Sequence, residues 1–190
     1  MRPPYVVWTL AAARGIVAAW SAGGRAAETG DAKERAAMAT RESELEALHT
    51  NTNALLAELR DLPEEKLTEV WLGDWSAREL LVHLGAWCDQ MGLAFERMAR
   101  GERPAPEGVD LSDADAMNAR FVEQAHGKSL AQVRKDLETG MARFEAAAKA
   151  LPEDRFAEGK TALRILHTIA NHPLEHIDEV RDWRRGAVAH

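Results

Sequence analysis

The sequence predicts an all-α protein in which four long helices form one four-helix bundle. Alanine, leucine, glutamate and arginine dominate the composition, and this mix favours helix over strand. Four long segments carry apolar residues at helical intervals of three and four, and no segment alternates convincingly with a period of two. The chain has 190 residues, of which 46% are hydrophobic, so it is long enough for one domain with a substantial core.

The first two long helices are indicated by leucine spacing and by a helix-start signal. The first is predicted over residues 41–61. Pro63 fits the first position of a short new turn, and residues 71–75 are predicted to form a loop. Residues 76–79, Ser-Ala-Arg-Glu, match a capping box, in which the first and last side chains bond each other's backbone amides. This pattern predicts the start of a second helix that ends near Arg100.

The second half of the chain repeats the alternation of helices and breaks. Residues 101–111 contain two prolines and two glycines and are predicted to form a loop. A short helix is expected over residues 112–126. Residues 129–132, Ser-Leu-Ala-Gln, match a second capping box, which predicts a third long helix ending near Leu151. The last helix is predicted over residues 161–185, where closing arginines suit the negative end of the helix dipole.

The N-terminal segment is predicted to stand apart from the bundle. Residues 1–37 are expected to be a disordered extension, or to result from translation begun upstream of a true start at Met38. The bundle then occupies residues 38–190. The alternative is a secretory signal peptide with its cleavage zone at residues 21–23. A membrane-spanning helix is not expected here, because Arg14 would lie near its centre.

The charge and the cysteine content exclude several classes of partner and of chemistry. The net charge is −7, which argues against a nucleic acid or an anionic membrane as partner, because both bind basic surfaces. Cys88 is the single cysteine, so no internal disulfide can form, and we expect it in the core rather than as a nucleophile. Without a need for an oxidising compartment, the expected location is the cytoplasm. The expected partner is a small-molecule substrate, and a homodimer is left open.

Three histidines interrupt apolar helix faces and are the candidate metal ligands. His172 and His176 are four residues apart, which places both imidazoles on one face of the last helix, as in many zinc or nickel sites. His83 interrupts the apolar face of the second helix. A buried polar group without a partner costs about 1–3 kcal/mol, so a shared metal would satisfy all three. The alternative is three separate core histidines, each bonded to a carbonyl or carboxylate. The remaining internal histidines, expected at the surface or in the core, are His49, His126 and His167.

Residues 172–176 also match H-x-x-E-H, the inverted zinc-protease pattern in which the glutamate is a general base. That pattern requires a further acidic ligand far downstream, and only 14 residues follow His176. Peptidase activity is therefore not expected, and Glu175 is kept only as a candidate catalytic base. Pro173 lies inside the pattern and is expected to kink the helix, because proline removes one helical hydrogen bond.

Three segments carry a resemblance to a known family. They read W-S-A-R-E-L-L-V-H-L-G-A-W at 75–87, A-D-A-M-N-A-R-F-V at 114–122 and H-P-L-E-H-I-D-E-V-R-D-W at 172–183. With these segments, residues 41–185 resemble the DinB-like superfamily of four-helix bundles. Relatives include ClbS-like proteins and thiol-dependent maleylpyruvate isomerases. In metal-binding members, one histidine of the second helix and a pair from the last helix hold zinc or nickel. The resemblance implies this role for His83, His172 and His176.

The resemblance and the histidine pattern together predict a divalent-metal-dependent enzyme that acts on a small molecule. Three histidine ligands leave an open coordination position for water or a thiol. The expected reactions are hydrolysis and thiol transfer, the latter with a low-molecular-weight thiol. Asn118, which lies in one of the resembling segments, and Trp87 are candidate substrate-binding residues. The alternative is a protein of the same fold that binds or sequesters a small molecule without turnover, with or without metal.

Overall fold

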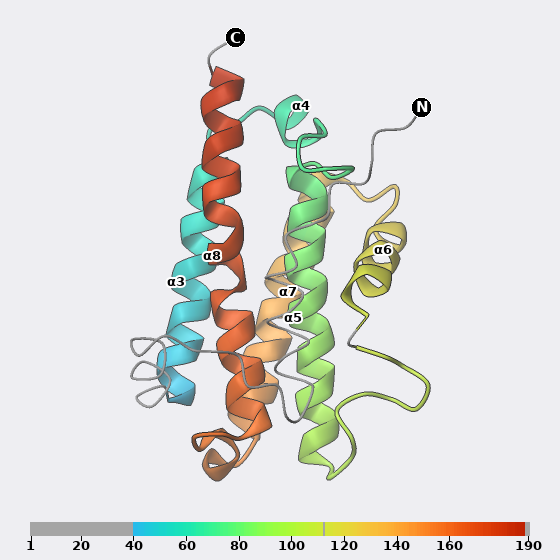
Figure 1. Ribbon diagram of the computed structural model, residues 1–190, viewed down its shortest axis with the longest axis vertical. Coiled ribbons are helices and arrows are strands. Elements are labelled where there is room, and N and C mark those ends of the chain that lie inside the picture. The colour runs from blue at the N-terminus through green and yellow to red at the C-terminus, as the bar shows by residue number, and fades with distance from the viewer. Residues whose placement is uncertain (1–39, 112, 189–190) are drawn as a thin grey trace.

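The protein, described here by a computed structural model that covers residues 40–111 and 113–188, is all-α, and its four long helices run side by side (Figure 1). This confirms the predicted fold class. The long helices are α3 (Arg41–Leu59), α5 (Ala77–Ala99), α7 (Leu130–Ala150) and α8 (Thr161–Val188). The shorter elements are α4 (Glu64–Leu67), α6 (Ala114–Gln124) and the 3₁₀ turn η1 (Glu153–Phe156). The expected N-terminal extension lies outside the described residues.

Side-chain caps fix where α5 and α7 begin. Ser76 and Glu79 form the predicted capping box at the start of α5. The capping box predicted for α7 is only half formed. Ser129 accepts a bond from the backbone amide of Gln132, but the Gln132 side chain donates to Asp136, one turn further along the helix. Because an exposed glutamine can bond along its own helix instead of back to the cap, the pattern predicted the helix start correctly and the second bond wrongly.

The bundle is built from two closely packed helix pairs, α3 with α8 and α5 with α7 (Figure 1). Glycines bring the backbones of α5 and α7 together. A Cβ added at Gly140 would overlap the carbonyl oxygen of Gly85, and one added at Gly85 would lie 2.8 Å from Cα of Leu137. Phe95 of α5 and Phe144 of α7 also stack between these helices, with their ring centroids 5.1 Å apart. The site-bearing helix α5 is therefore held rigidly against α7.

Replacing Gly140 by alanine is expected to lower the free energy of unfolding by about 1–3 kcal/mol, because the new methyl group forces two backbones apart. Urea unfolding followed by circular dichroism measures the change. Gly186→Ala is the matched control, since Gly186 lies in α8 with no neighbouring atom within 4 Å of an added Cβ. That control should be neutral or stabilising by up to about 1 kcal/mol, as alanine favours helix. Equal effects of the two substitutions would contradict the close-packing argument.

Helix α8 continues through Pro173, which is buried. The helix does not end at the proline, and the kink expected here stays a prediction. Proline leaves the carbonyl of Ile169 without its usual helical donor. At the next carbonyl, that of Ala170, the side chain of Asn51 in α3 donates a bond of 2.8 Å. The neighbouring helix thus supplies a hydrogen bond where the helical ladder is weakened, and both histidines that flank the proline still face the bundle interior.

Candidate metal centre

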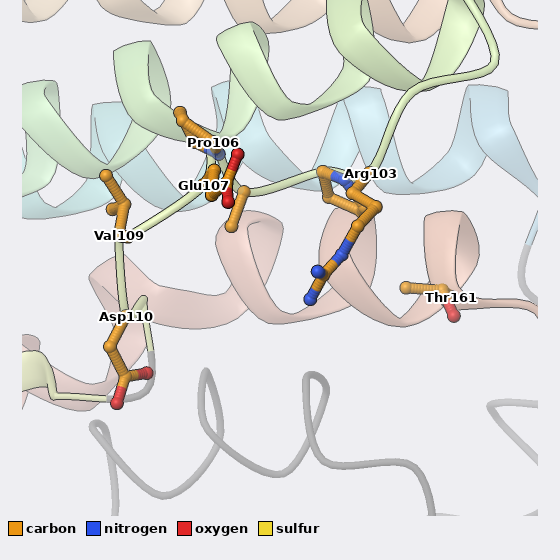
Figure 2. Close-up of a pocket in the computed structure, with 9 residues that line it drawn as sticks. Arg103, Pro106, Glu107, Val109, Asp110 and Thr161 are labelled. Carbon is orange, nitrogen blue, oxygen red and sulfur yellow. The ribbon is translucent and has the colours of Figure 1, made fainter.

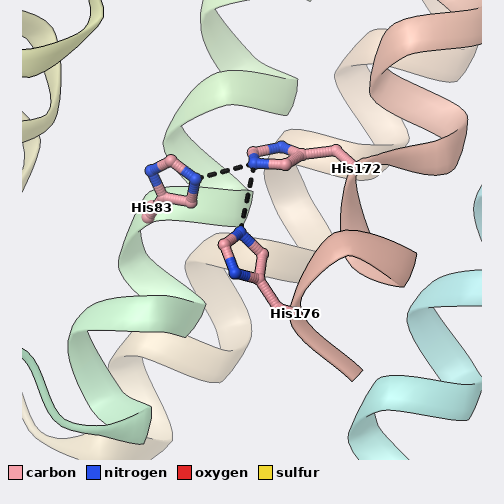
Figure 3. A group of neighbouring side chains, drawn as sticks. All are labelled: His83, His172 and His176. Carbon is pink, nitrogen blue, oxygen red and sulfur yellow. Dashed lines mark hydrogen bonds between the residues drawn. The ribbon is translucent and has the colours of Figure 1, made fainter. Parts of the chain in front are cut away.

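The three predicted histidines meet between α5 and α8, with their rings turned toward one another (Figure 3). Nε2 of His83 lies 2.7 Å from Nε2 of His172, and Nε2 of His176 lies 3.4 Å from that same atom. One ligand nitrogen from each residue lies within 4.8 Å of the other two. The side chains are nearly inaccessible, at 5%, 2% and 7% exposure for His83, His172 and His176. Two helices that are far apart in the sequence therefore bring their histidines together in one compact group.

Two of the three nitrogen separations can be compared directly with those around a tetrahedral metal ion, and the third is at most 4.8 Å. Ligand nitrogens at about 2.1 Å from a tetrahedral zinc ion lie about 3.4 Å from one another. The 3.4 Å separation of His172 and His176 already has this value. The 2.7 Å contact of His83 and His172 is a hydrogen bond and would have to widen by about 0.7 Å. Imidazole nitrogens are the donors that zinc and nickel accept, so the donor set is compatible with metal binding.

Burial keeps His83 and His172 neutral. It lowers the pKa of His83 to about 3, assisted by repulsion from His176 and partly opposed by the bond to Asn118. Burial also lowers the pKa of His172 well below its usual range, together with repulsion from His83 and His176. A neutral imidazole has the lone pair that a metal needs. The electrostatic environment therefore favours the metal-binding form of these two residues.

The outer nitrogens of two histidines have protein partners. Nδ1 of His83 bonds to Oδ1 of Asn118 at 2.9 Å, and Nε1 of Trp87 donates to the same oxygen, also at 2.9 Å. Nδ1 of His176 bonds to Oε2 of Glu179 at 2.9 Å. Such partners orient metal ligands in many proteins. Our sequence reasoning missed Glu179, although its position three residues after His176 on one helix was a usable signal.

The candidate substrate-binding residues are placed among protein groups. Trp87 is fully buried, and its ring packs edge-on against Phe121 of α6 with the centroids 5.4 Å apart. Asn118 is half-buried and carries the bonds to His83 and Trp87. Trp87 and Asn118 thus form a chain of hydrogen bonds that ends at His83 and supports its ring. A contact of either with substrate stays a prediction.

Glu175 lies beside the histidine group but does not join it. In the described part of the chain, one group of three or more potential metal ligands converges, and it holds histidines only. The Glu175 side chain is exposed by surface area, yet desolvation by the surrounding protein raises its pKa, and repulsion from Glu179 adds to this while His176 acts against it. A carboxyl of this kind suits proton transfer. Its role as a catalytic base stays a prediction.

The other reactive side chains lie apart from the group. Burial raises the pKa of the Cys88 thiol to about 12, with a contribution from Asp89, so this cysteine is an inert core residue as expected. His49 bonds to Glu145, and His167 bonds to Glu44. These contacts are separate from the three converging histidines and agree with the surface or core placement predicted for both residues.

A surface cavity of 590 Å³ lies between the loop after α5 and the start of α8 (Figure 2). Arg103, Glu107 and Asp110 supply its charged side chains, and Thr161 closes one side. None of the three histidines lines it.

Within the described ranges, no helix is long and apolar enough to cross a membrane.

The fold and the site define a class of protein: an all-α bundle with a buried group of three histidines between two of its long helices. The chain belongs to the DinB superfamily, whose family model matches residues 44–180. This confirms the resemblance seen in the sequence. A comparison with curated proteins finds no match.

Two crystal structures are similar to this chain. A structural-genomics target from Streptococcus pneumoniae has a TM-score of 0.64 and 13% identity, covering 77% of this chain and 91% of that one. An uncharacterised protein from Escherichia coli has a TM-score of 0.64 and 16% identity, covering 78% of this chain and 94% of that one. At these identities the two structures show the shared fold alone.

Proposed function

We propose that this protein is a divalent-metal-dependent enzyme that acts on a small molecule by hydrolysis or thiol transfer. One observation carries the proposal: three buried histidines, two of them held neutral by burial, present Nε2 atoms to one point in a DinB-superfamily bundle. His83, His172 and His176 would hold zinc or nickel. Three protein ligands are the number found in catalytic zinc sites, which keep one position open.

When bound, the metal would supply a Lewis acid that lowers the pKa of water or of a low-molecular-weight thiol. The chain's own residues would position that centre and manage protons. Asn118 and Glu179 hold the rings of His83 and His176. Glu175, which is close enough to His176 for their charges to interact, would take up the proton released by the nucleophile.

The second candidate function is binding or sequestering of a small molecule without turnover. A specific observation favours it. The 2.7 Å bond between His83 and His172 satisfies two buried histidines inside the protein without any ligand. A buried histidine group that is satisfied from within the protein is what a metal-free binding protein of this fold would contain. The two functions therefore differ in whether metal displaces this bond.

Metal titration followed by an activity screen separates the two functions. Calorimetry with Zn²⁺ and with Ni²⁺ should give one site per chain. The loaded and metal-free proteins are then compared on a panel of esters and amides, and on electrophiles supplied with cysteine or glutathione. We expect turnover that requires metal. Saturable binding of a panel compound without turnover would support the second function, and no metal binding would end the first.

Glu175→Gln is expected to lower the turnover number of the loaded enzyme by about 10²–10⁴-fold, because glutamine cannot accept a proton. Metal affinity should stay unchanged, since Glu175 is outside the converging group. Glu138→Gln, an exposed carboxylate of α7, is the matched control and should retain full activity. Steady-state kinetics on the best substrate of the screen measures both. Full activity of Glu175→Gln would remove this residue from the mechanism.

A further inference from the structure

We propose that Trp87 and Asn118 are positioning residues that fix His83 with its proton on Nδ1, and that His172 is the one histidine of the group whose ring proton moves when metal binds. This inference rests on the proposed metal site. It states which residues support the ligands of that site, and it predicts which ligand must change the position of its ring proton.

The first step is the orientation of the Asn118 amide. The indole nitrogen of Trp87 can only donate a hydrogen bond. Trp87 is 0% exposed, so water cannot accept that bond in place of protein. The atom 2.9 Å from Trp87 Nε1 must therefore be the amide oxygen of Asn118 and not its nitrogen. A buried indole thus settles an orientation that the Asn118 side chain alone would leave open.

The second step is the tautomer of His83. The same Asn118 oxygen lies 2.9 Å from Nδ1 of His83 and can only accept. Nδ1 of His83 must carry the hydrogen. Since the buried ring is neutral, Nε2 has no hydrogen and directs its lone pair at His172. The chain of bonds from Trp87 through Asn118 thus prepares His83 as a metal ligand before any metal arrives.

The third step is the position of the remaining proton. Glu179 accepts from Nδ1 of His176. Nε2 of His176 lies 3.4 Å from Nε2 of His172, so it presents a lone pair there if the His172 nitrogen carries the hydrogen. The 2.7 Å contact between His83 and His172 needs one hydrogen between the two Nε2 atoms. His83 cannot supply it, so His172 does, with its proton on Nε2. That proton occupies the place toward which a shared metal would be drawn.

Metal binding would therefore require a change at His172 alone. Its proton must leave Nε2, and a proton must be taken up at Nδ1, so that the ring stays neutral and no proton is released overall. His83 and His176 already have the ligand tautomer and need no change. In the metal-free group, His83 and His176 thus already have the tautomer that binds metal. The proton on Nε2 of His172 is the one that has to move before metal can bind.

Nitrogen-15 NMR of the imidazole rings tests the assignment, because protonated and unprotonated ring nitrogens have well-separated shifts. In the metal-free protein we expect hydrogen on Nδ1 of His83 and of His176 and on Nε2 of His172. With Zn²⁺, His172 should change to hydrogen on Nδ1, and the other two should keep their tautomers. Hydrogen on Nε2 of metal-free His83 would overturn the proposal. If Zn²⁺ does not bind at all, the proposed function fails, whereas the metal-free spectrum still decides the tautomer assignment.

Variants separate positioning from packing. Trp87→Phe keeps a ring against Phe121 but removes the indole donor, and Asn118→Ala removes the acceptor. Each should weaken Zn²⁺ binding by about 10–100-fold, as loss of a ligand's supporting bond does elsewhere. Asn118→Asp, whose carboxylate can accept both bonds, should restore affinity and the His83 tautomer.

Phe121→Leu is the packing control. It disturbs the contact between α6 and Trp87 but leaves the hydrogen bonds in place, so we expect less than a threefold change in Zn²⁺ dissociation constant. Competition with a chromogenic chelator measures all dissociation constants, and thermal unfolding checks that each variant is folded. If Phe121→Leu weakens Zn²⁺ binding as much as Asn118→Ala does, or if Asn118→Asp fails to restore affinity, these residues act only through packing and the positioning role is overturned.

Discussion

Mild acid is expected to destabilise the metal-free protein before most of its carboxylates titrate. Burial holds the pKa of His83 near 3 and that of His172 well below its usual range, whereas both titrate near 6.5 in the unfolded chain. Above pH 6.5 neither state binds these protons, so their contribution to stability is fully present. As the pH falls toward the folded pKa values, only the unfolded chain takes up protons, and stability is lost.

The size of this loss of stability follows from the two protons that His83 and His172 take up only in the unfolded chain. Each buried neutral histidine contributes about 1.4 kcal/mol per pH unit below its unfolded pKa, so the pair should cost about 4 kcal/mol between pH 8 and pH 5. Small domains have about 5–15 kcal/mol in total. Glu175, whose pKa is raised, acts in the opposite direction, but its side chain is exposed and its effect should be small.

Urea unfolding of the metal-free protein at half-unit steps from pH 8 to pH 5 measures this slope. His83→Gln should halve it, and the double variant with His172→Gln should nearly abolish it, whatever their stability at pH 8. Because the readout is the slope, a general loss of stability in the variants does not mimic the result. A free energy of unfolding that stays flat over this range would show that the folded state protonates these rings.

Replacing His176 by alanine is expected to lower metal affinity by more than 100-fold, because loss of a supporting bond alone costs about 10–100-fold and this change removes a ligand. At a free metal concentration of one hundred times the dissociation constant, the wild-type protein gains about 2.7 kcal/mol of stability. A chelator should therefore lower its melting temperature by several degrees, by about 2–4 °C for each kcal/mol. His176→Ala should show no response to the chelator, and His172→Ala should behave in the same way.

The matched control is His167→Ala, which removes a histidine from the same helix but from outside the converging group. Its baseline stability should fall, because the buried Glu44 loses the partner at 2.9 Å. Its response to the chelator should remain intact. A chelator response that disappears in His167→Ala as fully as in His176→Ala would show that the metal is bound elsewhere.

The periodic part of the structure could be predicted from the sequence, because helix formation depends on local spacing and caps. The interior position of the histidines was also predictable. His172 and His176 share a face with Ile165 and Ile169, and all four side chains are buried. A residue on the apolar face of a bundle helix has few places to point other than inward.

The partners of those histidines were not predictable, because they depend on how separate elements dock. Asn118 was expected to contact a substrate, which stays a prediction, and its bond to His83 of another helix was not foreseen. The outcome at Pro173 depended equally on a tertiary contact, since Asn51 of α3 bonds to α8 beside the proline. Side-chain pairs of this kind are separated by tens of residues, and propensity or periodicity does not specify them.

The contact between His83 and His172 joins equivalent positions of two similar halves of the chain. The two residues are 89 positions apart. In each half a long helix is followed by a short turn led by a proline, Pro63 or Pro152, and then by a helix that carries a histidine. A duplicated helical hairpin would produce this order.

The same offset relates His176 to Trp87. Strict equivalence of the halves would therefore give four histidines, enough to close a tetrahedral site completely. The second half has a histidine where the first has a tryptophan that bonds to Asn118. A metal bound by the three histidines would therefore keep one coordination position free, which is what the proposed enzyme requires.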